Sequence, residues 1–359
     1  MTVHQTGTTH PRIDLRAVRG DVEHRLRSFL DEKERSEDGG VLEVPLKVLR
    51  DFLDGGGKRV RPLFCCMGWL AVSDGPLEPA VLRVAAGLEL LHTAVLIHDD
   101  LVDVSDTRHD RPTVHRDFAA HSPVPREDWF GQGSAVLLGD LCEAWSAELL
   151  GRLAGPQPDT VREALDRMRS EVNVGQLLDL RSCGGDPGSV EDAFRLIHYK
   201  TTKYTVERPL QIGAALAGGD RAVLETCSAY ARPLGEAFQM YDDLEDVDGE
   251  VAGGDDLRDG KHTVVLALAL QHAGERDAGR LRELVGDGSL DEDGIKEARD
   301  LIAGSGAPAL VRRMVCDRRQ QALDVLDTAP FQPDAKKALR GLTDLAIPGV
   351  STWEITDAA

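Results

Sequence analysis

The sequence predicts an all-α protein folded as a single large helical bundle around a central cavity. Apolar residues recur at helical spacing along most of the chain, and no run alternates in the manner of a β-strand. Hydrophobic residues make up 42% of the 359 residues but aromatic residues only 4%, so Leu, Val and Ala must form most of the core. Because no long linker divides the chain, we expect a flexible N-terminal tail at residues 1–20 and one all-α domain at residues 21–359.

Short joints rich in Gly, Pro, Ser and Asp separate the helical segments, as in "GGGKRVRP", "HSPVPRED" and "SCGGDPGS". Between joints, apolar residues recur at i, i+3 and i+4, which places them on one face of a helix. In chain order, the predicted helices span residues 21–35, 59–71, 78–103, 133–153, 159–181, 190–217, 220–246, 262–273, 291–303, 309–327 and 334–345.

Charge and cysteine content exclude several classes of protein. The formal net charge of −20 argues against nucleic acid or an anionic membrane as a partner. The six cysteines form no C-x-x-C pair, so reduced thiols in the cytoplasm are the simplest interpretation. The N-terminus lacks the apolar core of a signal peptide, and we find no apolar run near the ~20 residues that a transmembrane segment needs.

Two predicted helices end in clustered aspartates. In "DDLVD", Asp99 and Asp103 are i and i+4 and share a face, with Asp100 beside them, at the helix end where the macrodipole disfavours anions. This motif alone is also compatible with a solvated helix end. The pattern recurs in "YDDLED", with the aspartates 242, 243 and 246. If the two helices are neighbours, six carboxylates converge on one cavity mouth, which indicates a site for a hard divalent cation, most plausibly Mg²⁺ sharing phosphate ligands.

Basic residues that would hold a phosphate lie elsewhere in the chain. "GGGKRVRP" places Lys58 and Arg61 beside three glycines and a predicted helix start, although a solvated turn has the same composition. His92 precedes Asp99 by two helical turns and would face the same cavity, unless it is an ordinary core histidine. The other candidate cations, each of which could instead pair with a surface carboxylate, are Arg108, Lys200, Lys203 and Lys261.

Together these motifs resemble the trans-polyprenyl diphosphate synthases, especially actinobacterial geranylgeranyl diphosphate synthases. The matching runs cover most of the chain after the tail: "GGGKRVRP", "LHTAVLIHDDLVD", "RPTVH", "GDL", "GQLLDL", "YKTTKYTVERPLQIGAAL", "FQMYDDLED" and "DDLRDGKHT". The resemblance implies an all-α fold, usually a homodimer, in which two aspartate motifs hold three Mg²⁺ around an allylic diphosphate. Ionisation of that diphosphate gives an allyl cation, which isopentenyl diphosphate attacks to form a longer trans-prenyl chain.

The resemblance also implies a role for each matching residue. It assigns the metal site to Asp99, Asp100, Asp103, Asp242, Asp243 and Asp246. It assigns the allylic diphosphate to Arg108, Lys200 and Lys261, and isopentenyl diphosphate to Lys58, Arg61 and His92. Thr201 and Gln239 match positions beside the reacting carbons. The catalytic candidates are therefore Asp99, Asp100, Asp103, Asp242, Lys200, Thr201 and Gln239.

This chain departs from the family pattern at two places. The family commonly has Arg-Arg-Gly after the first acidic motif, whereas here Arg108 is followed by His109, in the position of a second arginine that usually holds isopentenyl diphosphate. The loop after Asp246 is short and lacks a lysine that often precedes the one matching Lys261. These departures concern binding of the acceptor and of the leaving group, respectively.

Ala94 and Val95 lie one helical turn before Asp99 and are candidates for the wall that limits product length. In this family, large aromatic residues at these positions resemble a floor that stops growth at C15. Small residues here predict a deeper tube and, with the overall likeness, a C20 product, geranylgeranyl diphosphate. Ala94→Phe should then shorten the product. Ala94 and Val95 are equally compatible with simple packing against a neighbouring helix.

Three alternatives remain open at this level. A longer-chain synthase making C25 or beyond differs only in tube depth. A terpene cyclase, or a prenyltransferase using another acceptor, keeps the fold and metals, but has little reason to group Lys58, Arg61 and His92. A regulatory subunit of a heteromeric synthase predicts degenerate acidic motifs, and both motifs are intact here.

Overall fold

The computed structural model describes residues 13–36, 40–108, 111–153, 155–183, 188–248 and 255–353, and these are overwhelmingly helical. The α-helices are α1 (Leu15–Ser36), α2 (Glu43–Asp54), α3 (Val60–Val72), α4 (Pro79–Val102), α5 (Val114–Ala120), α6 (Glu127–Gly151), α7 (Pro158–Ser182), α8 (Val190–Ile197), α9 (Arg208–Leu216), α10 (Arg221–Asp248), α11 (Asp255–Asp259), α12 (Val264–His272), α13 (Glu275–Leu284), α14 (Glu292–Gly304), α15 (Ala307–Thr328) and α16 (Pro333–Ala346). A π-helix, η2 (His198–Glu207), joins α8 to α9, and η3 (Val350–Thr352) is a 3₁₀ turn.

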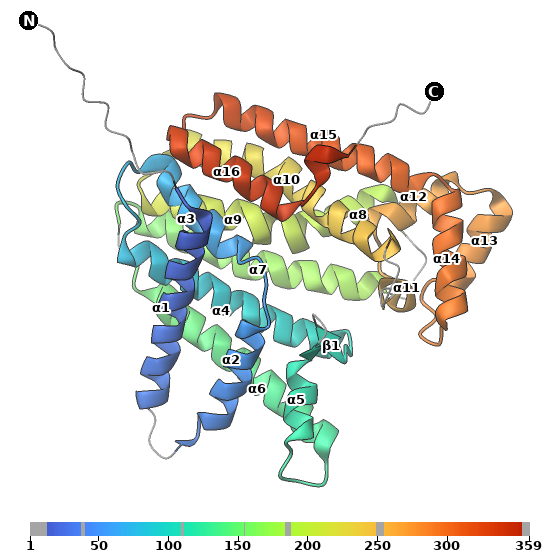
Figure 1. Cartoon of the computed structure of the whole chain (residues 1–359), viewed down its shortest axis with the longest axis horizontal. Helices are drawn as coiled ribbons and strands as arrows, with labels where there is room; N and C mark the ends of the chain where they lie inside the picture. Colours follow the sequence, from blue (N-terminus) through green and yellow to red (C-terminus); the bar gives the residue numbers. More distant parts are fainter. Residues whose placement is uncertain are drawn as a thin grey trace, which may run out of the picture.

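The helices form one bundle, as predicted. In Figure 1, α10, α15 and α16 lie on one side of the molecule and α4 and α6 on the opposite side, with α3, α7 and α9 between them. The most extensive contacts join α4 to α6, α3 to α9, and α10 to both α15 and η2. Helices distant in sequence therefore meet, and the ends of α4 and α10 can share a site.

Helix α4 is central because it packs into two separate clusters of buried side chains. Val84, Leu88 and Leu91 belong to the larger cluster, with α3, α9, α10 and α15. Leu90 and Ile97 belong to the smaller cluster, with α1, α2, α5 and α6. A helix that buries opposite faces must be apolar all round. Of the helices that the structure describes, α4 alone is long and apolar enough to cross a membrane, but 67% of its most apolar window is buried inside the fold.

The helix α3 approaches α9 very closely, and glycine makes this possible. A Cβ at Gly213 would clash with the carbonyl oxygen of Cys65, and one at Gly68 would clash with the carbonyl of Leu210. Each helix thus presents a glycine to the backbone of the other. This contact holds α3 against α9, which directly follows η2. It thereby fixes the "GGGKRVRP" motif at the start of α3 relative to the π-helix.

The structure differs from the sequence-based elements at several points. α1 begins at Leu15, within the predicted tail, because Val18 and Val22 are already buried; residues 1–12 lie outside the described residues. α2, α5, α11 and α13 were not predicted. A two-residue antiparallel hairpin, β1 (Thr107–Arg108) and β2 (Arg111–Pro112), pairs Arg108 with Arg111 directly after the first acidic motif.

Candidate active site

The first acidic motif forms the C-terminal end of α4, with Asp103 as the residue that caps the helix. Asp100 is 1% exposed and accepts hydrogen bonds from Arg108, whose Nη2 lies 2.7 Å from Asp100 Oδ1 and 3.4 Å from Asp99 Oδ2. Burial raises the pKa of Asp100 above its usual range, although the hydrogen bond from Arg108 opposes the shift. The hairpin therefore supplies the first cation that compensates this acidic helix end.

Two lysines from distant elements also contact this motif. Lys200 of η2 pairs with Asp179 of α7 and lies 3.7 Å from Asp99 Oδ1. Lys261, after α11, lies 3.2 Å from Asp103 Oδ2 and 3.0 Å from Asp256 Oδ1. Burial lowers the pKa of both ammonium groups, but the surrounding carboxylates outweigh it and leave both pKa values raised. The three cations predicted for the allylic diphosphate, Arg108, Lys200 and Lys261, thus all lie at the first acidic motif.

A close helix approach positions Lys200. A Cβ at Gly175 of α7 would lie 2.7 Å from both the Cα and the backbone nitrogen of Lys200. Glycine therefore lets η2 approach α7 closely enough for Lys200 to reach Asp179 and Asp99. Lys203, the other predicted basic residue of this segment, instead lies 2.8 Å from Glu171 Oε1 and belongs to a separate ion network with Arg208.

The second acidic motif lies near the end of α10 and is mostly buried. Thr201 Oγ1 donates to Gln239 Oε1 at 2.5 Å, and Gln239 Nε2 donates to Asp243 Oδ1 at 2.9 Å. Burial raises the pKa of Asp243 well above its usual value and that of Asp242 to about 7, with Lys58 opposing the shift at Asp242. The predicted pair Thr201 and Gln239 is therefore one hydrogen-bonded chain leading to the second motif.

The two motifs share one electrostatic neighbourhood. Asp179, Lys200, Thr201, Gln239, Asp243, Asp256 and Lys261 are among the residues that line a cavity of about 180 Å³. Lys261 also reaches Asp103, which joins this cavity to the first motif. Asp246 lies beside it, in a small pocket with Asp243 and Lys261.

Across the described residues, no three His, Cys, Asp or Glu side chains are placed to hold a metal ion together, because the aspartates face lysine and arginine instead. The donor set nevertheless fits a hard divalent cation, since it consists of carboxylate oxygens. Asp100 Oδ2 is buried without a hydrogen-bond partner in the described structure. Burial raises the pKa of Asp100, Asp103 and Asp242, so added positive charge beside these carboxylates would favour their ionised forms.

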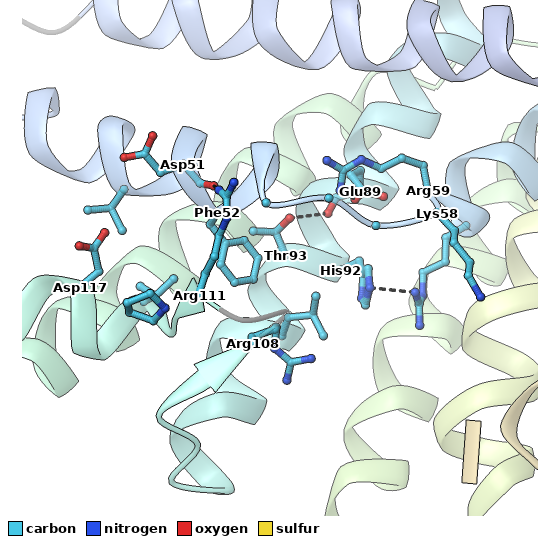
Figure 2. Close-up of a pocket in the computed structure, with 18 of the residues that line it drawn as sticks. Asp51, Phe52, Lys58, Arg59, Glu89, His92, Thr93, Arg108, Arg111 and Asp117 are labelled. Carbon is cyan, nitrogen blue, oxygen red and sulfur yellow. Dashed lines mark hydrogen bonds and ion pairs between the residues drawn. The ribbon is translucent and has the colours of Figure 1, made fainter. Parts of the chain in front are cut away.

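A second cavity, of about 230 Å³, contains the other predicted half of the site. Lys58, Arg61, His92 and Arg108 line it, as does Arg111, which sequence reasoning did not single out. Figure 2 shows Lys58 at the right of the view and Arg111 left of centre, with His92 and Arg108 between them. Within the described structure, Lys58, Arg61 and Arg111 have no carboxylate within 4.0 Å. Three cations without a directly paired carboxylate in one cavity are typical of an anion site.

The glycine loop before α3 shapes one wall of this cavity. Gly56 and Gly57 have φ of 117° and 105°, and Arg59 has φ of 52°, a left-handed conformation rare for a residue with a side chain. Arg59 Nη1 lies 2.7 Å from Glu89 Oε1, and Glu89 is only 3% exposed. This buried ion pair holds Arg59 in place, and Lys58 and Arg61, on either side of Arg59 and Val60, line the same cavity.

Ala94 and Val95 lie on different faces of α4. Ala94 is 3% exposed and packs in the smaller core cluster. Val95 is partly buried and packs against the larger cluster. The two residues therefore do not form one wall. His109, the remaining predicted substrate residue, lies outside the described residues.

Several site residues were missed from the sequence. Arg111 follows two residues after His109 in the quoted "RPTVH" run, and its charge was the available signal. Asp179 and Gln176 both contact the predicted cluster from the "GQLLDL" run. Nothing in the sequence indicated a role for Thr205 or Tyr204, because their contacts with Arg61 depend on the π-helix.

Comparisons with known proteins agree over nearly the whole chain. A family model described as polyprenyl synthetase matches residues 43–302. A nonaprenyl diphosphate synthase of Mycobacterium tuberculosis is 30% identical, over 92% of this chain and 93% of its own length, and an octaprenyl diphosphate synthase of Escherichia coli is 31% identical, over 82% and 87%. The crystal structure of a geranylgeranyl pyrophosphate synthase from Corynebacterium glutamicum, complexed with isoprenyl diphosphate and magnesium, superposes with a TM-score of 0.86 at 35% identity, covering 94% and 99% of the two chains.

Proposed function

The chain belongs to the polyprenyl synthetase family and is a prenyltransferase, and we propose that it condenses isopentenyl diphosphate with allylic diphosphates to make geranylgeranyl diphosphate, C20. The observation that carries this proposal is the pair of adjacent half-sites. One holds the aspartate motifs with Arg108, Lys200 and Lys261, and the other holds three cations without carboxylate partners. A reaction between two diphosphate substrates requires two such anion sites side by side.

In the allylic half-site, Lys200, Lys261 and Arg108 bind the leaving diphosphate and hold it in orientation. Mg²⁺, three ions by family resemblance, would be held by Asp99, Asp100, Asp103, Asp242, Asp243 and Asp246, and when bound supplies the positive charge that favours departure of the diphosphate. The Thr201 hydroxyl and Gln239 carbonyl present oxygen atoms, joined at 2.5 Å, to the allyl cation that ionisation leaves. Burial of this region excludes water, which would otherwise quench the cation.

In the acceptor half-site, Lys58, Arg61 and His92 bind isopentenyl diphosphate. Arg61 is buried and its pKa is lowered by desolvation, so an incoming diphosphate gains a strong, poorly hydrated partner. The alkene then attacks the allyl cation and loss of a proton completes the new double bond. We propose that His109 contributes to this half-site from the hairpin loop.

The length of the product is the part of the proposal that has a specific alternative. The Corynebacterium neighbour, at 35% identity, supports C20. The octaprenyl and nonaprenyl synthases among the relatives support a longer product from the same mechanism. Incubation with Mg²⁺, isopentenyl diphosphate and each of the C5, C10 and C15 allylic diphosphates, followed by mass spectrometry, separates them. A C20 diphosphate supports the proposal, a longer one replaces the product, and pyrophosphate release without elongation overturns the acceptor assignment and favours a cyclase.

We also propose a homodimer in the cytoplasm. Exposed apolar side chains lie on α6 and α7, including Leu137 at 69% and Leu177 at 61% exposure, and large exposed apolar side chains favour association. The six cysteines are all unpaired, which supports a reducing compartment. Light scattering on the purified chain should give twice 39.0 kDa, and Leu137→Asp with Leu177→Asp should shift it to the monomer. A wild-type mass of 39.0 kDa contradicts the dimer.

A further inference from the structure

The π-helix η2 contacts both half-sites through two threonines. Thr201 donates to Gln239 beside the second acidic motif at 2.5 Å. Thr205, four residues later, accepts a hydrogen bond from Arg61 Nη2 at 2.7 Å in the acceptor cavity. π-Helical segments often mark functional sites. The second contact adds Thr205 to the acceptor half-site.

Arg61 is held on three sides. Besides the Thr205 hydroxyl, its Nη1 lies 2.9 Å from His92 Nε2, and its guanidinium lies 4.6 Å from the centre of the Tyr204 ring. Thr205 and Tyr204 are each 1% exposed. A cation over an aromatic face is stabilised by the ring quadrupole, most strongly when water is absent. Arg61 therefore has one fixed position although no carboxylate of the described residues pairs with it.

The contact with Arg61 determines which nitrogen of His92 carries the proton. A guanidinium can only donate hydrogen bonds, so His92 Nε2 must accept. An imidazole that accepts at Nε2 carries its proton at Nδ1. Burial, with Arg61, Arg108 and Arg59 nearby, lowers the pKa of His92 well below its usual value, which keeps the ring neutral. His92 Nδ1 is itself buried and has no partner among the described residues.

The Tyr204 hydroxyl is not part of this arrangement. It is buried without a hydrogen-bond partner in the described structure, whereas the ring packs edge-on against His92, with centroids 6.0 Å apart, and lies face-on to Arg61. The aromatic ring therefore accounts for the contacts with His92 and Arg61, and removal of the hydroxyl alone should leave them intact.

We propose that Thr205 and Tyr204 are positioning residues of the acceptor half-site, which fix Arg61 so that a neutral His92 presents its Nδ1–H to the diphosphate of isopentenyl diphosphate. The inference rests on the proposed function, because it assumes that this diphosphate occupies the cavity of Lys58, Arg61 and His92. It assigns the donor atom on His92 and the two residues that orient it.

Steady-state kinetics on the full-length protein test the positioning role. Thr205→Val removes the acceptor for Arg61 and should raise KM for isopentenyl diphosphate about tenfold, while kcat and KM for the allylic diphosphate change less than about twofold. Thr205→Ser should restore the wild-type KM. Tyr204→Leu should raise the same KM several-fold, and Tyr204→Phe should not.

Thr202→Val is the matched control. Thr202 belongs to the same π-helix, is also 1% exposed, and its hydroxyl has no partner in the described structure. The same substitution there should leave all three kinetic constants unchanged. Equal effects of Thr202→Val and Thr205→Val would mean that Thr205 acts only through packing, and would overturn the proposal.

Nitrogen NMR of the histidine-labelled wild-type protein gives a second test that does not depend on a variant folding. His92, assigned by its loss in His92→Gln, should show a protonated Nδ1 and an unprotonated Nε2 at pH 7.5. The opposite tautomer, or a charged ring, contradicts the inference. If the wild-type protein elongates no allylic diphosphate, the proposed function fails; if it elongates but the variant and tautomer results are negative, only this inference fails.

Discussion

At the scale of single residues, Arg111 is a cation that sequence reasoning did not single out. It lines the acceptor cavity, and its Nη1 donates to the backbone carbonyl of Asp51 at 3.2 Å. A neutral carbonyl leaves most of the charge of the guanidinium uncompensated. Arg111 is therefore placed to supply positive charge that the family usually provides from the position of His109.

Arg111→Gln should raise KM for isopentenyl diphosphate about three- to tenfold and leave KM for the allylic diphosphate unchanged, because charge is lost from one cavity only. Initial rates at varied isopentenyl diphosphate measure this. Arg221→Gln is the control, since Arg221 is exposed and pairs with Glu225 far from the cavity. His109→Arg in the Arg111→Gln protein should restore the KM; no restoration would mean that the two positions are not equivalent.

The family resemblance predicts that Ala94→Phe shortens the main product, because that resemblance places the growing chain beside this position. Since Ala94 is 3% exposed in the smaller cluster, the ring must also displace neighbours, and the free energy of unfolding should fall by about 1–3 kcal/mol. Product analysis and thermal melting measure the two effects. Val95→Phe places a ring on the other face of α4; a shorter product only in that variant would show that the chain grows along the larger cluster.

The neutral state of His92 gives the free energy of unfolding a pH dependence. Below about pH 6.5 the unfolded histidine binds a proton that the folded one does not, so stability falls as pH falls. The charged or titratable groups that face the ring are Arg59, Arg61, Arg108 and Tyr204.

Between pH 7.5 and 5.5, urea unfolding of the wild-type protein should therefore lose about 1 kcal/mol more than that of His92→Gln, which has no such proton to bind. All other titrating groups are common to both proteins, so the difference isolates His92. An equal loss in the two proteins would mean that His92 keeps an ordinary pKa in the fold.

At the scale of elements, the contact between α3 and α9 is the most sensitive to side-chain size. Gly213→Ala places a methyl group against the Cys65 carbonyl, and backbone atoms there cannot move aside without separating the helices. We expect a loss of several kcal/mol in the free energy of unfolding, seen as a much lower melting temperature. Gly279→Ala in α13, where nothing lies within 4 Å of the new methyl group, should instead gain about 0.5–1 kcal/mol.

Long helices, in which apolar residues recur at helical spacing, could be predicted from the sequence. Short elements could not. Helices α4, α7 and α10 run for more than six turns, so the helical spacing of their apolar residues repeats often enough to be recognised. α5 has only seven residues, and the hairpin strands two each, too few for any period. The segment 190–217 was predicted as one helix; the π-helix inside it was not, because the change in backbone hydrogen-bond pattern has no sequence signal of its own.

The same distinction holds for the site. Charged motifs identified Asp99, Lys200 and Lys261, which the structure brings together. The partner of each charge was not predictable, because it depends on which helices pack together: Asp179 reaches Lys200 only through the Gly175 contact. The positions of Ala94 and Val95 on different faces of α4 likewise depend on the neighbours of that helix.

At the scale of the whole molecule, the two acidic helix ends make stability depend on cations. The chain carries a net charge of −20, and Arg108, Lys200 and Lys261 contact Asp99, Asp100 and Asp103 at the end of α4. Added positive charge that binds only the folded state must stabilise the whole bundle.

Mg²⁺ with inorganic pyrophosphate should therefore raise the melting temperature by about 5 °C or more, whereas Mg²⁺ alone, or pyrophosphate with a chelator, should do much less. Differential scanning fluorimetry measures this. Asp99→Asn with Asp242→Asn should remove the effect. An equal shift in this double variant would place the binding of metal and pyrophosphate elsewhere on the molecule.

The π-helix has one more consequence, which concerns rotational phase. In a π-helix, each residue turns about the helix axis by a smaller angle than in an α-helix. After the ten residues of η2, the side chains of α9 therefore face a different direction around that axis than they would after an uninterrupted α-helix. Lys200 lies in the first turn of η2, and Gly213 lies after η2, in α9. A single-residue deletion within 198–207 would turn one relative to the other, and would disturb substrate binding and the α3 contact in the same step.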